Sequence, residues 1–500
     1  MRKIWICLLL CAVLLLGGCV SSMPVEYDGP AEPLPQVREG PQAPVGDSQS
    51  GRTFSAVLYV PNADGSQLSA QVREISVAPG ESEPEVIIRE LLDVISQSSF
   101  SGGQQLRLAS LSFPVEITGE LATVDLNTSA RVLGIEALFA LRMAITNTLT
   151  ELSDIKYVNT LINGWDTGLD VAMTLPVGVM ARYPSGDVAA FWSQVEAQRL
   201  AEQGELQKTA ALYFACDGGE MMLAEARNIT FESRSLNEYA QKLLEELSAG
   251  ATQLSGVQAL VPPADYFERD AEVVENPDTS ERIAVLCLRE EVDDFLLLRD
   301  STRAQMLMTI CYTLTGFLPR LDGVALYIGG ELVRDLTMPD GTAWHAEDGV
   351  LRRKELSAFV ADVLRVYYPT ADGSGLATVY RPVAQRYRNS ARALLRELMR
   401  DPEDEALVPA LPAGITDADI IGIAISGDTA LINVTQAFAD ACDGMDAVEE
   451  RNMIYAIVNT ITELQGVTRV RFYVDGEQTE LAGHLFLPGE FLRNSGLILE

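Results

Sequence analysis

The chain repeats one pattern of residues three times, and this repetition limits the fold to a tandem array of similar units. The first landmark runs from Tyr59 to Leu68 and returns from Tyr367 to Leu376 with the shared residues Ala-Asp-Gly-Ser. A degraded copy begins at Tyr213, so the three tyrosines are spaced 154 residues apart. A unit of that length is large enough to fold as a domain.

Three more landmarks follow in the same order in every copy. They are an Asn-Thr-Leu-Thr-Glu-Leu type segment, a turn pair and an apolar residue before proline. In the first copy these lie at 147–152, 163–164 and 175–176. In the middle copy they lie at 312–317, 329–330 and 338–339, and in the third at 459–464, 475–476 and 487–488. This order predicts a triplicated domain. The units are 52–205 with a connecting helix, a degenerate copy at 206–360, and 361–500. They are called the first, middle and third repeats below.

The apolar periodicity predicts the same element order in each repeat. In the first repeat, we expect strands at 55–60, 68–77, 113–117, 121–126 and 157–162, and helices at 84–95 and 135–152. This order favours an α+β fold in which a mixed or antiparallel sheet has two helices packed on one face. In the middle repeat, the second hairpin is expected at 283–288 and 295–298. The connecting segment 354–364 is expected to be helical.

The first residues indicate export. Arg2 and Lys3 precede an apolar stretch at 4–16, which is shorter than the roughly 20 residues that a membrane span needs. The sequence therefore predicts a signal peptide at 1–18. Its end, Leu-Gly-Gly-Cys19, resembles the lipobox of bacterial lipoproteins, in which the peptide is cut before the cysteine and the thiol receives a diacylglycerol. The alternative is a plain signal peptide with a chance cysteine.

Lipidation at Cys19 implies a protein attached to the extracytoplasmic face of the cell membrane. Residues 20–51 are rich in Pro, Gly, Ser and Glu, so 19–51 is interpreted as the lipid anchor and a flexible linker.

The composition excludes several other classes of function. The chain has 37 Lys and Arg against 71 Asp and Glu, a formal net charge of −34, which argues against binding nucleic acid through a basic face. The only histidines are His345 and His484, so sites built from clustered histidines are not expected. The four cysteines beyond Cys19 form no Cys-x-x-Cys motif and are interpreted as buried free thiols, although disulfides stay open.

The landmarks together resemble the GerMN-domain family of sporulation and germination lipoproteins. The resemblance is carried by Leu91-Leu92, Val124-Asp125-Leu126, Asn147 to Leu152 and Asn163-Gly164, and by Leu394-Leu395, Ile432-Asn433-Val434, Asn459 to Leu464 and Asp475-Gly476. It implies a non-enzymatic scaffold that supports assembly of an envelope complex, with a sporulation channel complex as one candidate partner. Two copies are the usual arrangement, so a third, degenerate copy departs from the family pattern.

One polar cluster could form a site. It consists of Asn147, Thr148 and Glu151 in the first repeat and Asn459, Thr460 and Glu463 in the third, whereas the middle repeat has Tyr312 and Gly316. The alternative is that these side chains cap or bridge elements within each domain.

Other motifs point to no cofactor and no metal. The Asp-Gly pairs at Asp64 and Asp372 are interpreted as turns rather than calcium loops, because a calcium loop needs several oxygen ligands at fixed spacing. Nucleophile-elbow, zinc-protease and P-loop motifs are absent from the sequence.

We therefore expect a scaffold that is not an enzyme. A ligand-binding or cell-wall-binding lipoprotein that serves an envelope enzyme or a sensor kinase is the alternative. An envelope hydrolase using paired carboxylates stays open.

Overall fold

A computed structural model describes residues 42–500, apart from 201–203, 278, 443, 479–480, 483–484, 487–488 and 500. The predicted signal peptide, Cys19 and His484 lie outside the described residues. Of the helices in this part of the chain, none combines the length and apolar character that a membrane crossing requires.

The predicted element order recurs in all three repeats. The first repeat contains β2 (Arg52–Pro61), β3 (Leu68–Val77), α2 (Glu83–Gln97), β4 (Glu116–Thr118), β5 (Leu121–Leu126), α3 (Ile135–Leu149), β6 (Tyr157–Ile162), β7 (Met180–Ala181) and α4 (Val188–Leu200). The middle repeat contains β8 (Leu206–Cys216), β9 (Met222–Phe231), α5 (Leu236–Ala249), β10 (Val257–Gln258), β11 (Phe267–Glu275), β12 (Arg282–Leu288), α6 (Val292–Leu297), α7 (Arg303–Phe317), β13 (Leu321–Ile328), β14 (Glu331–Leu332), β15 (Asp335–Thr337), β16 (Ala343–His345) and β17 (Val350–Leu351). The third contains β18 (Ala361–Pro369), β19 (Leu376–Ala384), α8 (Ala391–Leu398), β20 (Ile420–Ser426), β21 (Thr429–Val434), α9 (Gln436–Cys442), α10 (Ala447–Ile461), β22 (Arg469–Val474), β23 (Leu481–Ala482), β24 (Leu485–Phe486), β25 (Phe491–Leu492) and β26 (Ile498–Leu499).

Strand pairing is also the same in the three repeats. Each begins with a long antiparallel hairpin, which is β2–β3, β8–β9 or β18–β19. A second antiparallel pair follows, and its second strand runs parallel to the strand after the second helix: β5 with β6, β12 with β13, and β21 with β22. A parallel pair needs a crossover, and α3, α7 and α10 supply it. The structure confirms the predicted α+β class and the tandem repeats.

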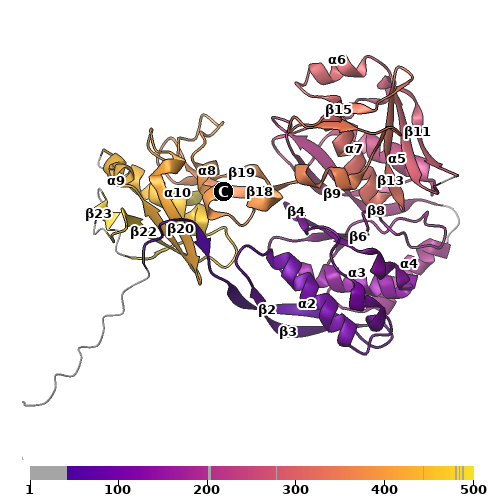
Figure 1. Cartoon of the computed structure of the whole chain (residues 1–500), viewed down its shortest axis with the longest axis horizontal. Helices are drawn as coiled ribbons and strands as arrows, with labels where there is room; N and C mark the ends of the chain where they lie inside the picture. Colours follow the sequence, from indigo (N-terminus) through magenta and orange to yellow (C-terminus); the bar gives the residue numbers. More distant parts are fainter. Residues whose placement is uncertain are drawn as a thin grey trace, which may run out of the picture. The chain divides into compact units, whose positions relative to one another are not determined.

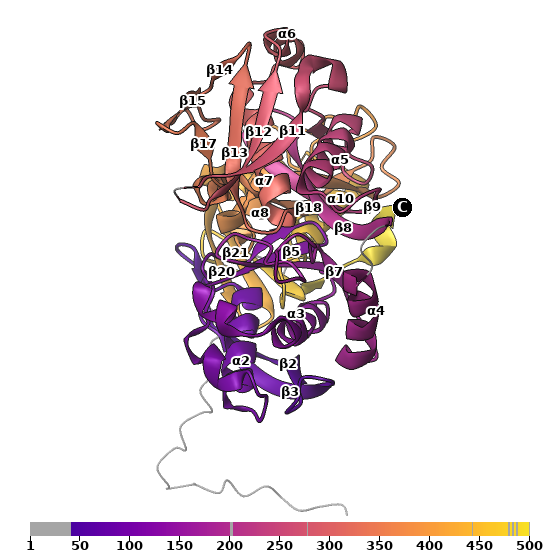
Figure 2. The same cartoon turned by 90° about the vertical axis from the view of Figure 1, so that its right-hand side faces the viewer.

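The helices of the first repeat lie between two sheets. Figures 1 and 2 show α2 and α3 with the β2–β3 hairpin on one side and the sheet that contains β5 and β6 on the other. Accordingly α3 is buried on all faces along most of its length. The structure thus divides the single predicted sheet into a two-stranded hairpin and a mixed sheet, with the helix layer between them.

Two local predictions in and after the middle repeat are wrong. The strand expected at 295–298 falls on helix α6, because Val292, Phe295 and Leu296 are buried at helical spacing and Asp293 and Asp294 lie in the first helical turn. The helix expected at 354–364 is replaced by two short 3₁₀ turns, η4 (Arg353–Glu355) and η5 (Ser357–Phe359), followed by β18. There, pairing with β19 overrides the local helical pattern.

The first and middle repeats share one apolar core. A single cluster of buried apolar side chains runs from Ala56 to Val360, whereas the third repeat has its own cluster from Leu364 to Val474. Burial of apolar surface is the main favourable term in folding, so the first two repeats are expected to unfold together.

The end of the predicted linker adds a strand to the third repeat. Strand β1 (Ser48–Gln49) pairs in parallel with β20, with Ser48 opposite Ala424. The backbone N–H of Ile423 donates to Asp47 (3.0 Å), and the side-chain amide of Asn433 donates to the carbonyl of Pro44 (2.8 Å). Residues 44–50 are therefore bound to the third repeat, although they precede the first strand of the first repeat.

Candidate functional site

The repeated tyrosines and threonines form the same contact in all three repeats. The backbone N–H groups of Tyr59, Tyr213 and Tyr367 donate to the hydroxyl oxygens of Thr148, Thr313 and Thr460, at distances of 3.0, 3.0 and 3.1 Å. Each bond joins the first strand of a repeat to its second helix. The threonines of the predicted polar cluster therefore connect two elements of their own repeats.

The glutamates of the predicted cluster belong to a Tyr–Glu–Arg group. In the first repeat, the Tyr59 hydroxyl donates to Glu151 (2.7 Å), and Arg182 contacts both side chains. The third repeat repeats this group, with the Tyr367 hydroxyl 2.6 Å from Glu463 and Arg493 paired with that glutamate at 2.6 Å. Arg182 and Arg493 were not among the predicted residues. The signal that would have found them is an arginine after each Leu-Pro landmark.

The asparagines of the predicted cluster hold the segment that carries this arginine. Asn147 donates to the carbonyl of Tyr183 (2.9 Å) and accepts from the Tyr183 N–H (3.0 Å). Asn459 makes the same pair of bonds with Asn494, at 3.0 and 2.9 Å. The structure therefore places the six predicted residues in two equivalent groups, one in each repeat, where they bridge neighbouring elements.

The middle repeat completes its group with a residue from the first repeat. Its arginine is Arg353, and the position of the glutamate is occupied by Gly316. The missing carboxylate comes from Glu116 on β4, which accepts from Arg353 (3.2 Å) and from the Tyr312 hydroxyl (2.7 Å). The Arg353 guanidinium lies 3.7 Å from the centre of the Tyr312 ring and also donates to the carbonyl of that residue (2.9 Å).

Gly316 also allows a direct contact between these repeats. The buried Asn159 side chain of the first repeat donates to the Gly316 carbonyl (3.2 Å). A Cβ at position 316 would lie 3.2 Å from an Arg353 nitrogen, so a longer side chain would have to displace it. The middle repeat therefore departs from the repeat pattern at the residues that contact the first repeat.

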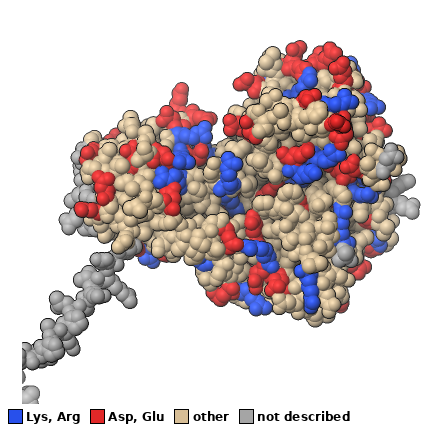
Figure 3. Space-filling model, in the orientation of Figure 1, with Lys and Arg blue, Asp and Glu red and all other residues tan. Residues whose placement is uncertain are grey.

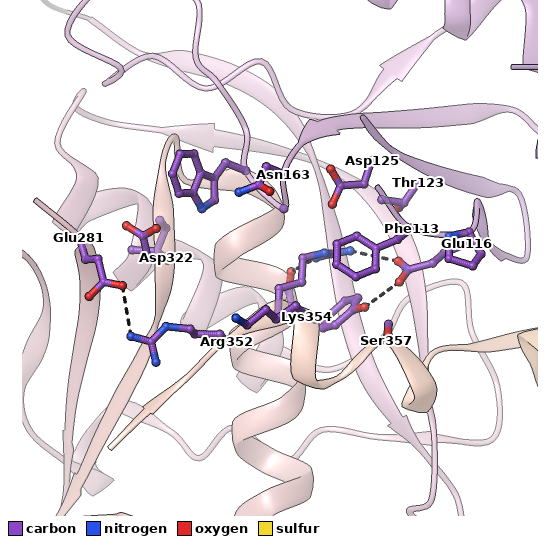
Figure 4. A pocket seen from close by; sticks show the side chains of 16 residues that line it. Phe113, Glu116, Thr123, Asp125, Asn163, Glu281, Asp322, Arg352, Lys354 and Ser357 are labelled. Carbon is purple, nitrogen blue, oxygen red and sulfur yellow. Dashed lines mark hydrogen bonds and ion pairs between the residues drawn. The ribbon is translucent and has the colours of Figure 1, made fainter. Parts of the chain in front are cut away.

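A cavity of about 220 Å³ lies beside this contact, between the first and middle repeats (Figure 4). Both repeats contribute polar and aromatic side chains to its wall. The lining residues are Phe113, Pro114, Glu116, Thr123, Asp125, Asn163, Gly164, Trp165, Glu281, Tyr312, Leu321, Asp322, Arg352, Arg353, Lys354 and Ser357. Figure 4 shows Asp125 and Asp322 across the cavity from each other.

Asp125 is the most unusual group in this wall. Its side chain is on β5, and the residue is only 5% exposed. The backbone N–H groups of Gly164 and Asn163 interact with the carboxylate, while its buried Oδ1 has no hydrogen-bond partner among the described residues. Burial raises the pKa of Asp125 to about 6, with Glu116 adding to the rise and Arg353 opposing it. The wall of the cavity thus contains a buried carboxylate, one oxygen of which other parts of the described chain leave unpaired.

Other reactive groups do not gather here. Within the described ranges, no group of three or more His, Cys, Asp or Glu side chains is placed to hold a metal ion. Cys216, Cys287 and Cys311 are buried free thiols, as predicted, and Cys442 is also buried. Burial raises the pKa of Cys311 to about 12, which keeps that thiol protonated and unreactive at neutral pH.

Comparison with known protein families supports the resemblance drawn from the landmarks. The family model described as "Germane: Sporulation and spore germination" matches residues 57–167 and 365–480. Two segments of this chain therefore match the Germane (GerMN) domain. The matched segments lie in the first and third repeats, and the middle repeat, which shares their strand order, lies outside them. The Germane family is not a known enzyme family.

Three solved structures share weaker similarity with the chain. The tandem GerMN domains of the sporulation protein GerM from Bacillus subtilis are 18% identical, with 58% of this chain and 99% of that chain covered and a TM-score of 0.23. The first GerMN domain of the same protein is 14% identical (27% and 98% covered, TM-score 0.22), and a candidate lipoprotein from Clostridium perfringens is 20% identical (26% and 87% covered, TM-score 0.19). Among curated proteins, no sequence matches this chain.

Proposed function

We propose that this protein is a lipoprotein of the extracytoplasmic face of the cell membrane, where it serves as a scaffold for an envelope complex in sporulation or germination. The observation that carries the proposal is that two segments matching the Germane domain follow a sequence that resembles a lipobox. In this proposal, the diacylglycerol on Cys19 anchors the chain, the partners are envelope proteins, and no reaction is catalysed.

The way the sheet edges are closed supports a scaffold of fixed geometry. The first strand of each mixed sheet would expose backbone groups that invite another strand. On β4, the N–H of Ile117 donates to the side chain of Gln385 from the third repeat (3.0 Å). On β11, the N–H groups of Ala271 and Val273 donate to side chains of α5, and β20 is paired with β1. Partners would therefore meet side-chain surfaces rather than these strand edges.

The surface charge fits contacts that are specific rather than broadly electrostatic. Figure 3 shows acidic and basic side chains interspersed on the visible face, although the chain as a whole carries a net charge of −34. A mixed surface favours partners whose charged groups are complementary to particular acidic and basic side chains. The excess of acidic residues favours solubility of the folded part of the chain.

The test is crosslinking in living cells that carry a tagged copy of the full chain, followed by identification of the captured proteins. Capture of components of a sporulation or other envelope complex, lost in a Cys19→Ser variant, is the expected result. Capture of wall enzymes or a sensor kinase alone would favour the alternative, a binding lipoprotein that serves those proteins. Capture by the Cys19→Ser variant at the same level would contradict a role for the anchor.

A further inference from the structure

The three repeats carry different side chains at one equivalent position of a strand. This position is the next-to-last residue of the central parallel strand, and it is occupied by Asp125 on β5, Cys287 on β12 and Asn433 on β21. In each repeat, the neighbouring parallel strand ends in a turn pair. In the first repeat, this turn pair is Asn163-Gly164. The same site can therefore be compared three times within one chain.

In two repeats, the chain itself supplies a partner for this side chain. The side-chain oxygen of Asn433 accepts from the Gly476 N–H (3.0 Å), and its side-chain nitrogen donates to the Pro44 carbonyl (2.8 Å). In the middle repeat, the Cys287 sulfur accepts from Arg269 (3.2 Å). Each side chain thus meets a group of complementary hydrogen-bonding character.

In the first repeat, the corresponding side chain lies in the wall of the cavity. The Asp125 carboxylate interacts with the Gly164 and Asn163 N–H groups, much as Asn433 accepts from the Gly476 N–H. The Asp125 side chain lies in the wall of the cavity (Figure 4), and its buried Oδ1 has no hydrogen-bond partner among the described residues. Where Asn433 presents a donor to a peptide carbonyl, Asp125 presents a buried charged acceptor, so its complement is a hydrogen-bond donor with positive charge.

The remaining charges of the cavity favour the same kind of ligand. Two of its carboxylates are already paired, since Glu116 contacts Arg353 and Glu281 contacts Arg352 (3.2 and 3.3 Å). The charged lining residues that remain after these two pairs are Asp125, Asp322 and Lys354. With both aspartates ionised, this set has one excess negative charge; Arg320 and Arg352 act on Asp322, which leaves Asp125 as the carboxylate whose charge a ligand cation would meet.

The size and walls of the cavity limit the ligand to a small organic molecule. At about 30 Å³ per water, 220 Å³ corresponds to roughly seven water volumes and thus to a molecule of on the order of seven to ten non-hydrogen atoms. Phe113, Pro114 and Trp165 offer apolar surface to a short carbon skeleton. We propose that this cavity binds the primary ammonium group of a small organic molecule, with the ammonium hydrogen-bonded to Asp125.

This proposal is independent of the scaffold function, because it rests on the cavity alone. The ammonium could belong to a simple amine or to an amino acid, whose carboxylate would then face Lys354. Saturation-transfer NMR on the purified full chain in detergent distinguishes these sources with propylammonium, L-alanine, propionate and N-acetylglucosamine as probes. We expect saturable binding of propylammonium, and binding of alanine as well if the natural ligand is an amino acid.

The variant Asp125→Asn is the sharpest test, because asparagine is the residue that the third repeat carries at this position and it retains an acceptor for Gly164. It should weaken propylammonium binding at least tenfold without lowering the melting temperature. Asp270→Asn removes one exposed carboxylate on β11 and should leave binding unchanged. If Asp125→Asn does not fold, Asp322→Asn on the opposite wall provides the second test and should weaken binding several-fold.

The proposal is overturned if propylammonium does not bind at concentrations up to tens of millimolar. It is also overturned if propionate or N-acetylglucosamine binds in place of the amine, or if the aspartate variants bind it as well as the wild type does.

Discussion

Replacing Glu116 by glutamine tests whether the first repeat supplies the carboxylate that the middle repeat has lost. The side chains of Arg353 and Glu116 are 9% and 11% exposed and lie 3.2 Å apart. Removing one charge from a buried pair leaves the other without compensation, which costs about 3–5 kcal/mol. Glutamine keeps an oxygen for the Tyr312 hydroxyl, and Arg353 keeps the Tyr312 carbonyl. We therefore expect Glu116→Gln to lower the free energy of unfolding by about 3 kcal/mol, at the low end of that range.

The matched control is Glu151→Gln, which changes the equivalent pair of the first repeat. There the side chains of Arg182 and Glu151 are 34% and 31% exposed, and exposed pairs contribute about 0–1 kcal/mol. The assay is differential scanning calorimetry. A shared core of roughly 300 residues has an unfolding entropy of about 0.6 kcal/mol/K, so a loss of 3 kcal/mol lowers its Tm by about 5 °C and a loss of 1 kcal/mol by less than about 2 °C.

The third repeat has its own core, so its unfolding transition should stay where it is in both variants. Equal shifts for Glu116→Gln and Glu151→Gln, or a larger shift for the control, would refute the reasoning. The glutamate from β4 would then not be acting as the buried partner of Arg353.

Three further changes have defined outcomes. The pKa of Asp125 is raised from 3.8 to about 6, so the folded protein holds a proton that the unfolded chain releases, and stability should fall by up to about 3 kcal/mol between pH 4 and pH 7. Asp125→Asn should remove that part of the pH dependence, as read from urea midpoints, and an unchanged dependence would contradict the assignment. In Gly422→Ala, the new Cβ would lie 2.5 Å from the backbone nitrogen of Gly46, so limited proteolysis should cut residues 43–50 several-fold faster than in the wild type. Gly444→Ala, where the Cβ meets no atom within 4 Å, is the control, and equal cutting of both variants would argue against the β1–β20 pairing. Cys19→Ser should move the protein from the membrane fraction to the soluble fraction, and retention in the membrane would argue against lipidation at that residue.

Much of the fold could be predicted because it is encoded locally and three times over. The spacing of Tyr59, Tyr213 and Tyr367 located the repeats, and period-2 and helical patterns placed most strands and helices near their observed positions. One error arose at 295–298, a short segment whose buried neighbours Val292, Phe295 and Leu296 have helical spacing and form α6. The order of elements along the first and third repeats could be predicted in this way, whereas the division of the single expected sheet into a hairpin and a mixed sheet could not.

The polar cluster illustrates a middle case. Its residues stood out because Asn147, Thr148 and Glu151 recur as Asn459, Thr460 and Glu463. Their bonds to the first strand and to the arginine segment required the tertiary structure, since those partners are far away in the sequence. Recurrence indicated that the residues matter to the repeat, while the contacts indicate that they join its elements.

By itself, the sequence determined the number of repeats, the α+β class and the positions at which the middle copy departs from the other two. Only the tertiary structure decided what those departures are for. Glu116 and Arg353 are 237 residues apart, Asp125 acquires its character from a cavity between two repeats, and β1 pairs with a strand more than 370 residues later. Pairings of this kind depend on which surfaces meet after each repeat has folded, and local patterns of hydrophobicity carry no record of that choice.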